Sequence, residues 1–307
     1  MRHRSLLLTL LLPLVAVSGC SAGTVDKTSA GPRVRIVGQN FTEADVVSQL
    51  YRALLDAAGF SATVRPIGGR DLYLGPLEKG TVQVAADSLA ATTDAVNHRA
   101  TGDDAGVTVA SSDVAATLAQ LRRVGADAGL TPLAPTGAEL KAGYAVTRAF
   151  ATANHLRTLS DLGRLGRPVA LTASPDCAQR PDCAPGLQRV YRVQVSKVEP
   201  LGSGTSDTKE ALLQGQVQLA QVATTDAQIG TDMVLLSDDQ HLLNAENITP
   251  LVNSHWLEHH ARARDAIDRL SDVLTTDDLR TMTARVNTGD QTARAVARAY
   301  LKQKGLV

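Results

Sequence analysis

Residues 34–59 read VRIVGQNFTEADVVSQLYRALLDAAG, and this stretch decides the fold that the sequence predicts. Its first four residues are mostly β-branched and predict a strand. Thr42 is a plausible N-cap for a helix, since acidic residues follow it in the first turn. Apolar residues then recur at helical spacing: Val46, Val47, Leu50, Leu54 and Leu55. Gly59 is placed to end the helix, and residues 60–64 predict a second strand, which completes a βαβ unit.

The turn between this strand and this helix is the first candidate ligand site. In open α/β sheets, ligands bind where the carboxyl ends of strands meet the amino ends of helices. We therefore expect four residues of the turn to face a ligand: Gln39, Asn40, Phe41 and Thr42. Thr42 has two interpretations, because its hydroxyl suits either a ligand or a structural N-cap.

The amino-terminal residues predict an export signal. Basic residues precede an apolar run at 6–17, which is too short for a comfortable transmembrane helix. Small residues stand directly before Cys20, as in a bacterial lipobox, so we expect a signal peptide at 1–19 and a lipid anchor on Cys20. The alternative is an ordinary secretory signal with an incidental cysteine. Residues 20–32 are rich in small and polar residues and predict a flexible tether.

The overall composition limits the partners and the ligand sites to be expected. The chain carries 31 basic and 31 acidic side chains, a balance that does not favour nucleic acid as a partner. About 290 residues remain after the predicted signal peptide, enough for two domains. Hydrophobic residues make up 44%, ample for a core, but aromatic residues make up only 3%. The chain therefore has few rings with which to build an aromatic ligand site.

A loop–helix–glycine–strand pattern occurs twice and indicates two similar α/β lobes. The first copy starts with the glycines at 68–69 and ends with a strand at 82–86. The second starts with the glycine-rich loop 202–204 and ends with a strand at 217–222. We expect the chain to leave the first lobe, build the second and return. The expected boundaries are 33–138 and 242–307 for lobe 1, and 139–241 for lobe 2.

Other segments are expected to complete these lobes. We predict further strands at 144–147, 169–171, 234–236 and 248–252, and further helices at 112–126, 276–286 and 292–304. Residues 130–135 contain two prolines and are expected to form an irregular connector.

Cys177 and Cys183 flank a five-residue loop. An exported chain folds in an oxidising compartment, so we expect a disulfide that closes the loop. The alternative is a reactive or metal-binding pair of thiols, although the spacing is not that of a zinc knuckle.

Short motifs along the chain resemble, in their order and spacing, those of one family. They are Gly38-Gln39-Asn40-Phe41-Thr42-Glu43, Ser160-Asp161-Leu162, Arg180 followed by Pro185-Gly186-Leu187, Thr225-Asp226, Leu236-x-Asp238-Asp239 and Ala299-Tyr300-Leu301-Lys302. The family is that of the glycine betaine/choline (osmoprotectant) substrate-binding lipoproteins of ABC transporters, and the resemblance covers nearly all of the exported chain.

The resemblance implies both a fold and a function. The fold is the two-lobed periplasmic-binding-protein fold of type II, an α/β fold in which helices flank a mostly parallel sheet in each lobe. The function is capture of a small polar or zwitterionic, osmoprotectant-like solute by hinge closure, and its delivery to an ABC permease. The protein would be a monomer without a cofactor, anchored through Cys20 on the outer face of the cytoplasmic membrane. A ligand-sensing lipoprotein of the same fold, without transport, is the alternative.

The resemblance also suggests a type of ligand site. Betaine-binding members of this family surround the quaternary ammonium group with a cage of tyrosines, whose ring faces attract the cation. Most of the matching positions in this chain are not aromatic: one reads Ser88, directly after Asp87, and another falls near Glu246. Tyr144 matches a cage position, whereas Tyr191 is either a second cage residue or a core tyrosine. Asp87 and Glu246 would instead offer carboxylates to a cation, or hydrogen bonds to a polar solute.

Arg180 matches an arginine that binds the ligand carboxylate in family members. A guanidinium group can bind a carboxylate through two parallel hydrogen bonds, and the cysteine loop would brace it. The alternative is an exposed arginine on a loop. Asp226 would either orient the hinge or contact the ligand.

One short pattern favours an enzyme instead. His255, Glu258 and His259 match the H-x-x-E-H motif of inverted zinc peptidases. A catalytic zinc needs a third ligand, and no residue nearby in the sequence supplies one. Because an exposed charged helix also explains the motif, we expect neither a metal site nor enzymatic activity.

Overall fold

The structure is a computed structural model, and it describes residues 31–102 and 108–307. The predicted signal peptide, the lipidation site Cys20 and most of the predicted tether lie outside the described residues. Residues 31–307 belong to one compact unit. Within the described residues, no helix is both long enough and apolar enough to span a membrane.

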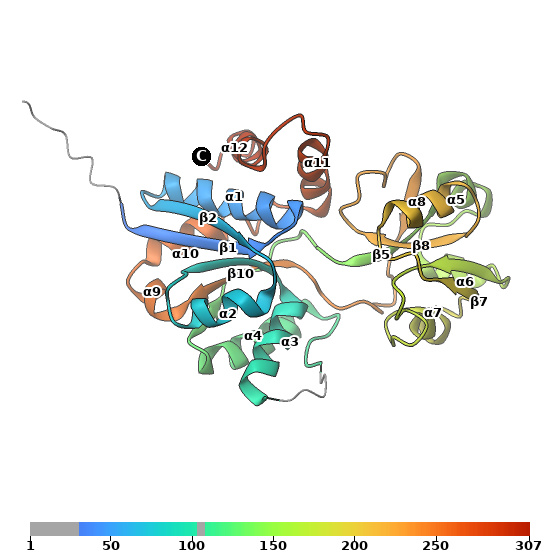
Figure 1. Cartoon of the computed structure of the whole chain (residues 1–307), viewed down its shortest axis with the longest axis horizontal. Coiled ribbons are helices and arrows are strands. Elements are labelled where there is room, and N and C mark those ends of the chain that lie inside the picture. Colours follow the sequence, from blue (N-terminus) through green and yellow to red (C-terminus); the bar gives the residue numbers. More distant parts are fainter. Residues whose placement is uncertain (1–30, 103–107) are drawn as a thin grey trace, which may run out of the picture. The chain divides into compact units, whose positions relative to one another are not determined.

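The first sheet is built around the amino-terminal βαβ unit (Figure 1). Its strands are β1 (Arg33–Gln39), β2 (Ser61–Ile67), β3 (Val84–Ser88), β4 (Leu130–Pro132) and β10 (Ile248–Asn253), in the order β2-β1-β3-β10-β4. β1 is parallel to β2 and β3, whereas β10 is antiparallel to both of its neighbours. Only β10 therefore runs against the other strands of this sheet.

The second sheet repeats the same arrangement. Its strands are β5 (Ala142–Thr147), β6 (Val169–Thr172), β7 (Val195–Glu199), β8 (Leu219–Ala223) and β9 (Met233–Leu236), in the order β7-β6-β8-β5-β9. β6 is parallel to β7 and β8, and β5 is antiparallel to both of its neighbours. The prediction of two α/β units with mostly parallel sheets is therefore confirmed.

Helices flank both sheets. Those that accompany the first sheet are α1 (Thr42–Ala57), α2 (Arg70–Glu78), α3 (Leu89–Thr101), α4 (Val114–Asp127), α9 (Ser254–Glu258), α10 (Ala261–Asp268), α11 (Thr276–Asn287) and α12 (Ala293–Gln303). Those that accompany the second are α5 (Arg148–Asn154), α6 (Leu159–Arg164), α7 (Ala184–Tyr191) and α8 (Ser206–Leu213).

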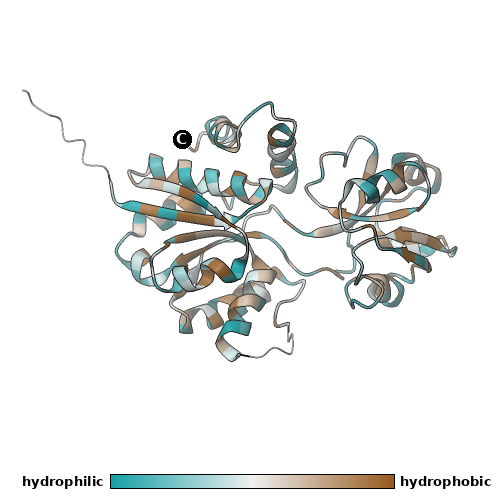
Figure 2. Cartoon of the chain, in the orientation of Figure 1, coloured by the Kyte–Doolittle hydropathy of each residue, from teal (hydrophilic) through white to brown (hydrophobic). Residues whose placement is uncertain are grey.

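Helix α1 buries the apolar face that its periodicity predicts. All five apolar residues named for it are at most 1% exposed, and they join a core with β1, β2 and the carboxy-terminal helices. Figure 2 shows the corresponding pattern, with apolar stretches along the strands and mixed colouring on the helices. Gly59 follows the helix with φ of 85°, a left-handed conformation that glycine adopts without strain.

Two local predictions are wrong. Phe41, not Thr42, occupies the N-cap position of α1, and the Thr42 hydroxyl instead donates to Oδ1 of Asn287 at 2.8 Å. Residues 130–135 are not wholly irregular, because Leu130–Pro132 forms strand β4 and pairs with β10. Pro132 is tolerated because β4 is an edge strand, where a missing N–H need not leave a partner unpaired.

The segment that follows β8 contacts helices of the first sheet. The Thr225 hydroxyl donates to Oε1 of Glu43 at 2.9 Å, and Nη2 of Arg280 donates to the Thr224 carbonyl at 2.8 Å. Glu43 lies in the first turn of α1, so this contact reaches the same strand–helix junction that the sequence predicts as a ligand site.

Candidate functional site

A cavity of about 370 Å³ lies at the carboxyl ends of β1 and β3. Five of the residues predicted for the ligand site line it: Gln39, Phe41, Ser88, Arg180 and Glu246. Eight further residues line it that the sequence reasoning missed: Arg70, Ala91, Leu140, Lys141, Ala142, Asp182, Leu243 and Asn244. We call this the cleft cavity.

The strand-end rule accounts for the first part of the lining. Gln39 is the last residue of β1 and Ser88 the last of β3, and these parallel neighbours end at the same edge of the sheet. Phe41 follows β1 and is 39% exposed, and among the described residues that line this cavity it is the one aromatic residue. Asn40 and Thr42, predicted beside them, are not part of the lining.

Arg70 brings a fixed positive charge to the cavity. Its Nε and Nη2 donate to Oδ2 and Oδ1 of Asp87 at 2.7 and 2.6 Å, and the Tyr73 hydroxyl donates to the same carboxylate. Burial alone would lower the pKa of Arg70, but the hydrogen bonds and charge of Asp87 outweigh it and raise that pKa. The Asp87 side chain is only 2% exposed, so it acts on the cavity through Arg70 and not by direct contact.

Arg70 could have been found from the sequence. It begins α2 directly after the glycines that follow β2, and β2 is parallel to β1. The strand-end rule that selected Gln39 thus applies to Arg70 as well. Its pairing with Asp87, which lies 17 residues further along the chain, cannot be predicted from the periodicity of apolar residues.

Glu246 is the partly buried carboxylate of the cavity. Its Oε2 accepts a hydrogen bond from the backbone N–H of Ala91 at 3.1 Å. Burial raises the pKa of Glu246, and the opposing hydrogen bonds from Ser88 and Ala91 do not cancel that rise. The carboxylate is thus incompletely compensated by the protein, which makes it a good partner for a cationic ligand group.

Arg180 lies on the loop that Cys177 and Cys183 close. The two cysteines form a disulfide with their Cα atoms 5.1 Å apart, and the N–H of Cys183 donates to the Arg180 carbonyl at 3.0 Å. The Arg180 guanidinium group donates from Nε and Nη2 to the Asp182 carboxylate at 2.9 and 2.6 Å. These hydrogen bonds raise the pKa of Arg180 in spite of partial burial. Asp182 thus already occupies the fork that was expected to hold a ligand carboxylate.

The two candidate cage tyrosines do not line the cleft cavity. Tyr144 is 1% exposed, and its hydroxyl donates to the backbone carbonyl of Asp182 at 3.1 Å. Tyr191 is buried in the core of the second sheet, where its hydroxyl donates to Asp238 and accepts from the N–H of Gln240. Tyr144 is therefore hydrogen-bonded to the arginine loop but does not line the cavity, and Tyr191 fits its interpretation as a core residue.

Asp226 also lies away from the cavity lining. Its carboxylate pairs with Nζ of Lys209 at 3.0 Å and accepts from the N–H of Gln228 at 2.9 Å. Lys209 lies on α8, so Asp226 links the loop that follows β8 to that helix.

The H-x-x-E-H stretch lies on an exposed surface. His255, Glu258 and His259 are all exposed, and the two imidazole rings meet edge to face with centroids 5.0 Å apart. Among the residues that the structure describes, no group of three or more His, Cys, Asp or Glu side chains could hold a metal ion. The described part of the fold therefore brings no third ligand to the motif.

Comparisons with known proteins show the family to which the chain belongs. A family model described as the substrate binding domain of ABC-type glycine betaine transport system matches residues 32–303. A glycine-betaine-binding protein of Pseudomonas aeruginosa is 24% identical over 288 residues, which cover 89% of this chain and 88% of that protein.

Solved structures show the same fold. Apo YehZ from Escherichia coli is 21% identical with a TM-score of 0.77, over 91% of this chain and 100% of the other. The crystal structure of a glycine betaine/carnitine/choline ABC transporter is 17% identical with a TM-score of 0.78, over 90% of this chain and 99% of the other. The two mixed sheets thus form a periplasmic-binding-protein-like fold.

Proposed function

Because this chain belongs to the family of substrate-binding domains of ABC-type glycine betaine transport systems, we propose that it captures a small zwitterionic solute for an ABC permease. The observation that carries the proposal is the charge arrangement of the cleft cavity. A partly buried carboxylate, Glu246, lines it together with the guanidinium groups of Arg70 and Arg180. These charges complement a ligand that has a cationic and an anionic end.

The cation of this ligand should carry N–H groups. A quaternary ammonium cannot donate ordinary hydrogen bonds, so proteins hold it against several aromatic faces. Phe41 is the sole ring in the described lining, whereas Glu246 offers carboxylate oxygens that accept hydrogen bonds. We therefore favour a primary or secondary ammonium over the trimethylammonium group of glycine betaine.

Calorimetry with glycine, sarcosine, dimethylglycine and glycine betaine tests this preference. The four solutes share a carboxylate and a positive charge, but each methyl group replaces one N–H. We expect affinity to fall along the series, with glycine betaine at about 100 μM or weaker, as when several kcal/mol of cage energy is missing. Affinity that rises along the series, or no binding by any zwitterion in a wider panel of amino acids and carnitine, would contradict the proposal.

Capture would occur by hinge closure between lobe 1 (33–138 and 242–307) and lobe 2 (139–241). A ligand that contacts both lobes stabilises the state in which they approach, and the permease would recognise that state. Small-angle scattering should then give a smaller radius of gyration with saturating ligand. An unchanged radius would favour a ligand-sensing protein without closure.

Export and anchoring complete the proposal. The lipobox-like residues before Cys20 support a lipid anchor on the outer face of the cytoplasmic membrane. Cys20→Ala should release the protein from the membrane fraction and abolish labelling with radioactive palmitate. Continued labelling of that variant would contradict the anchor.

A further inference from the structure

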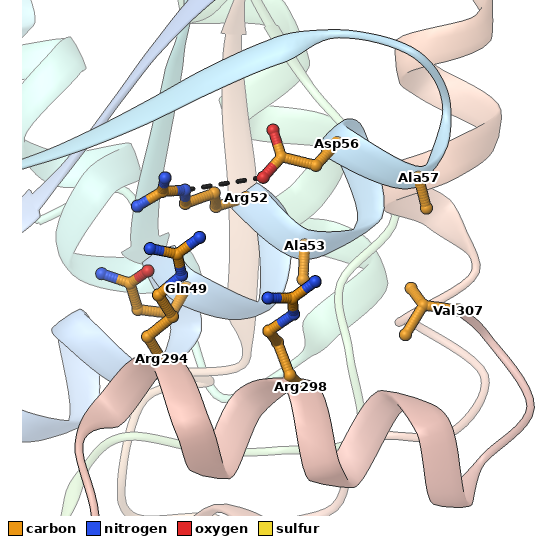
Figure 3. A pocket seen from close by; sticks show the side chains of 8 residues that line it. All are labelled: Gln49, Arg52, Ala53, Asp56, Ala57, Arg294, Arg298 and Val307. Carbon is orange, nitrogen blue, oxygen red and sulfur yellow. Dashed lines mark ion pairs between the residues drawn. The ribbon is translucent and has the colours of Figure 1, made fainter.

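A second cavity, of about 230 Å³, lies between α1 and α12 and shares no lining residue with the cleft cavity (Figure 3). Arg52 reaches it from α1, and Arg294 and Arg298 point toward it from α12. The one acidic residue in its described lining is Asp56. We call it the arginine pocket.

A single carboxylate, that of Asp56, stands against three arginines in the described lining of this pocket. Arg52 Nε forms an ion pair with Oδ2 of Asp56 at 3.6 Å, a distance too long for a hydrogen bond. The other oxygen of Asp56 accepts from the N–H of Ala62 at 3.0 Å. Neither Arg294 nor Arg298 makes a hydrogen bond or ion pair with any residue that the structure describes.

The two arginines of α12 also repel each other. They are four residues apart, so they lie on the same face of the helix, where like charges are destabilising. Arg52 adds a third positive charge across the pocket. A bound anion would remove this repulsion.

Two polar atoms of the pocket also lack a hydrogen-bond partner. Oε1 of Gln49 and Nε of Arg52 are buried without a hydrogen-bond partner. One is an acceptor and the other a donor, so a ligand that both donates and accepts would suit them. Such atoms usually find a partner in a ligand or an ordered water.

We propose that the arginine pocket binds a phosphate group. Guanidinium forks match phosphate oxygens with paired hydrogen bonds, and hydrogen phosphate adds a P–OH donor for Gln49. The pocket is smaller than the range of about 300–1,000 Å³ that is typical for drug-sized ligands, which favours a single small group.

Two kinds of molecule would supply this phosphate group: a phospholipid headgroup and inorganic phosphate. The pocket lies at the end of the fold where the chain enters β1: the N–H of Ser61 donates to the Pro32 carbonyl at 2.9 Å, and Ala62 beside it contacts Asp56. Cys20 is close upstream in the sequence, so a lipid anchor there would hold this end near phospholipid headgroups. Inorganic phosphate is the other source.

The test compares two double variants in the full chain. Arg294→Gln/Arg298→Gln removes the unpaired charges of the pocket, while glutamine keeps a similar helix propensity. The matched control is Arg122→Gln/Arg189→Gln, which removes the same charge from exposed, unpartnered arginines of α4 and α7. All proteins carry Cys20→Ala, so that no lipid anchor contributes to vesicle binding.

Two ligands are measured at constant ionic strength set with chloride. Calorimetry with inorganic phosphate and sedimentation with phosphatidylglycerol vesicles, against phosphatidylcholine vesicles, distinguish the two sources. We expect at least one ligand to bind, and the pocket variant to bind it at least about tenfold more weakly, a difference of about 1.4 kcal/mol. The control variant should bind like the parent protein.

Each remaining outcome overturns the proposal. It fails if the parent protein binds neither phosphate nor phosphatidylglycerol, or if both double variants lose affinity equally, because the effect then follows net charge and not the pocket. Circular dichroism and thermal midpoints establish that the variants are folded. Arg298→Lys, which keeps the charge but loses the fork, should fall between the parent protein and the double variant.

Discussion

The cleft cavity and the arginine pocket both contain arginines, but they differ in how these are paired. In the cleft cavity, Arg70 is held by Asp87 and Arg180 by Asp182, each through two hydrogen bonds. In the arginine pocket, Arg294 and Arg298 have no such partner among the described residues. A carboxylate partner fixes a guanidinium group in position and reduces its attraction for other anions. The first arrangement therefore suits selection of a ligand by shape and charge, and the second suits attraction of an anion.

The largest expected effect concerns the buried pair of the cleft cavity. Asp87→Ala leaves Arg70 mostly buried without its partner, and losing one member of a buried pair costs about 3–5 kcal/mol of unfolding free energy. Arg70→Met/Asp87→Leu removes both charges and should cost clearly less. Urea denaturation measures both. Asp265→Ala, at an exposed position of α10, is the control and should stay within about 0.5 kcal/mol of the parent protein.

If the single and double variants were equally unstable, the contrast between paired and unpaired arginines would not explain the stability of this cavity. That result would mean that packing around these side chains, and not pairing of their charges, stabilises this part of the cavity.

An intermediate effect is expected at Glu246, and it should depend on pH. Glu246→Gln removes the counter-charge for a ligand ammonium and should weaken zwitterion binding at neutral pH by about tenfold or more, which is at least about 1.4 kcal/mol. In the unmodified protein, affinity should fall as pH decreases through the raised pKa of Glu246, hence above the usual glutamate value of 4.5. Calorimetry across pH measures this. In the glutamine variant, that part of the pH dependence should disappear.

Stability provides the control for this variant. A carboxyl group whose pKa is higher in the folded protein than in the unfolded chain binds protons more readily when folded. Its contribution to stability therefore decreases as pH rises from about 4.5 through the raised pKa. Glu246→Gln should then be at least as stable as the parent protein at neutral pH. A less stable variant would show that the carboxylate has a structural role.

The smallest effect is expected at Asp182. Asp182→Asn weakens the hold on Arg180 and frees its guanidinium group for a ligand carboxylate, so zwitterion affinity should increase by a few fold, about 1 kcal/mol or less. Asp176→Asn is the matched control, because its carboxylate lies 3.7 Å from Arg180 and is more exposed. Calorimetry at low and moderate salt compares the two. Weaker binding by the Asp182 variant would mean that Arg180 must be held in place to function.

Part of the site was predictable because it depends on strand direction. Gln39 and Ser88 end parallel neighbouring strands, and both patterns are local in the sequence. The resemblance to binding proteins, and not the strand pattern, selected Ser88, Arg180 and Glu246, which also line the cleft cavity. Tyr144 matched a motif as well, yet its side chain is buried and its hydroxyl donates to the Asp182 carbonyl of the arginine loop. A motif identifies a position in the chain, but it does not show which way the side chain faces.

The sequence by itself determined the two α/β units, because the periodicity of apolar residues identifies the face of each helix and strand that avoids water. It did not determine β4, whose pairing with β10 joins residues far apart in the chain. Only the tertiary structure decided which charges meet. Asp87 meets Arg70 and Asp182 meets Arg180, whereas three arginines from α1 and α12 gather around one carboxylate, Asp56, in the described lining of their pocket. Hydrophobic burial is a property of each segment and repeats along it. Pairing of charges depends on distances between segments, and these exist only once the chain has folded.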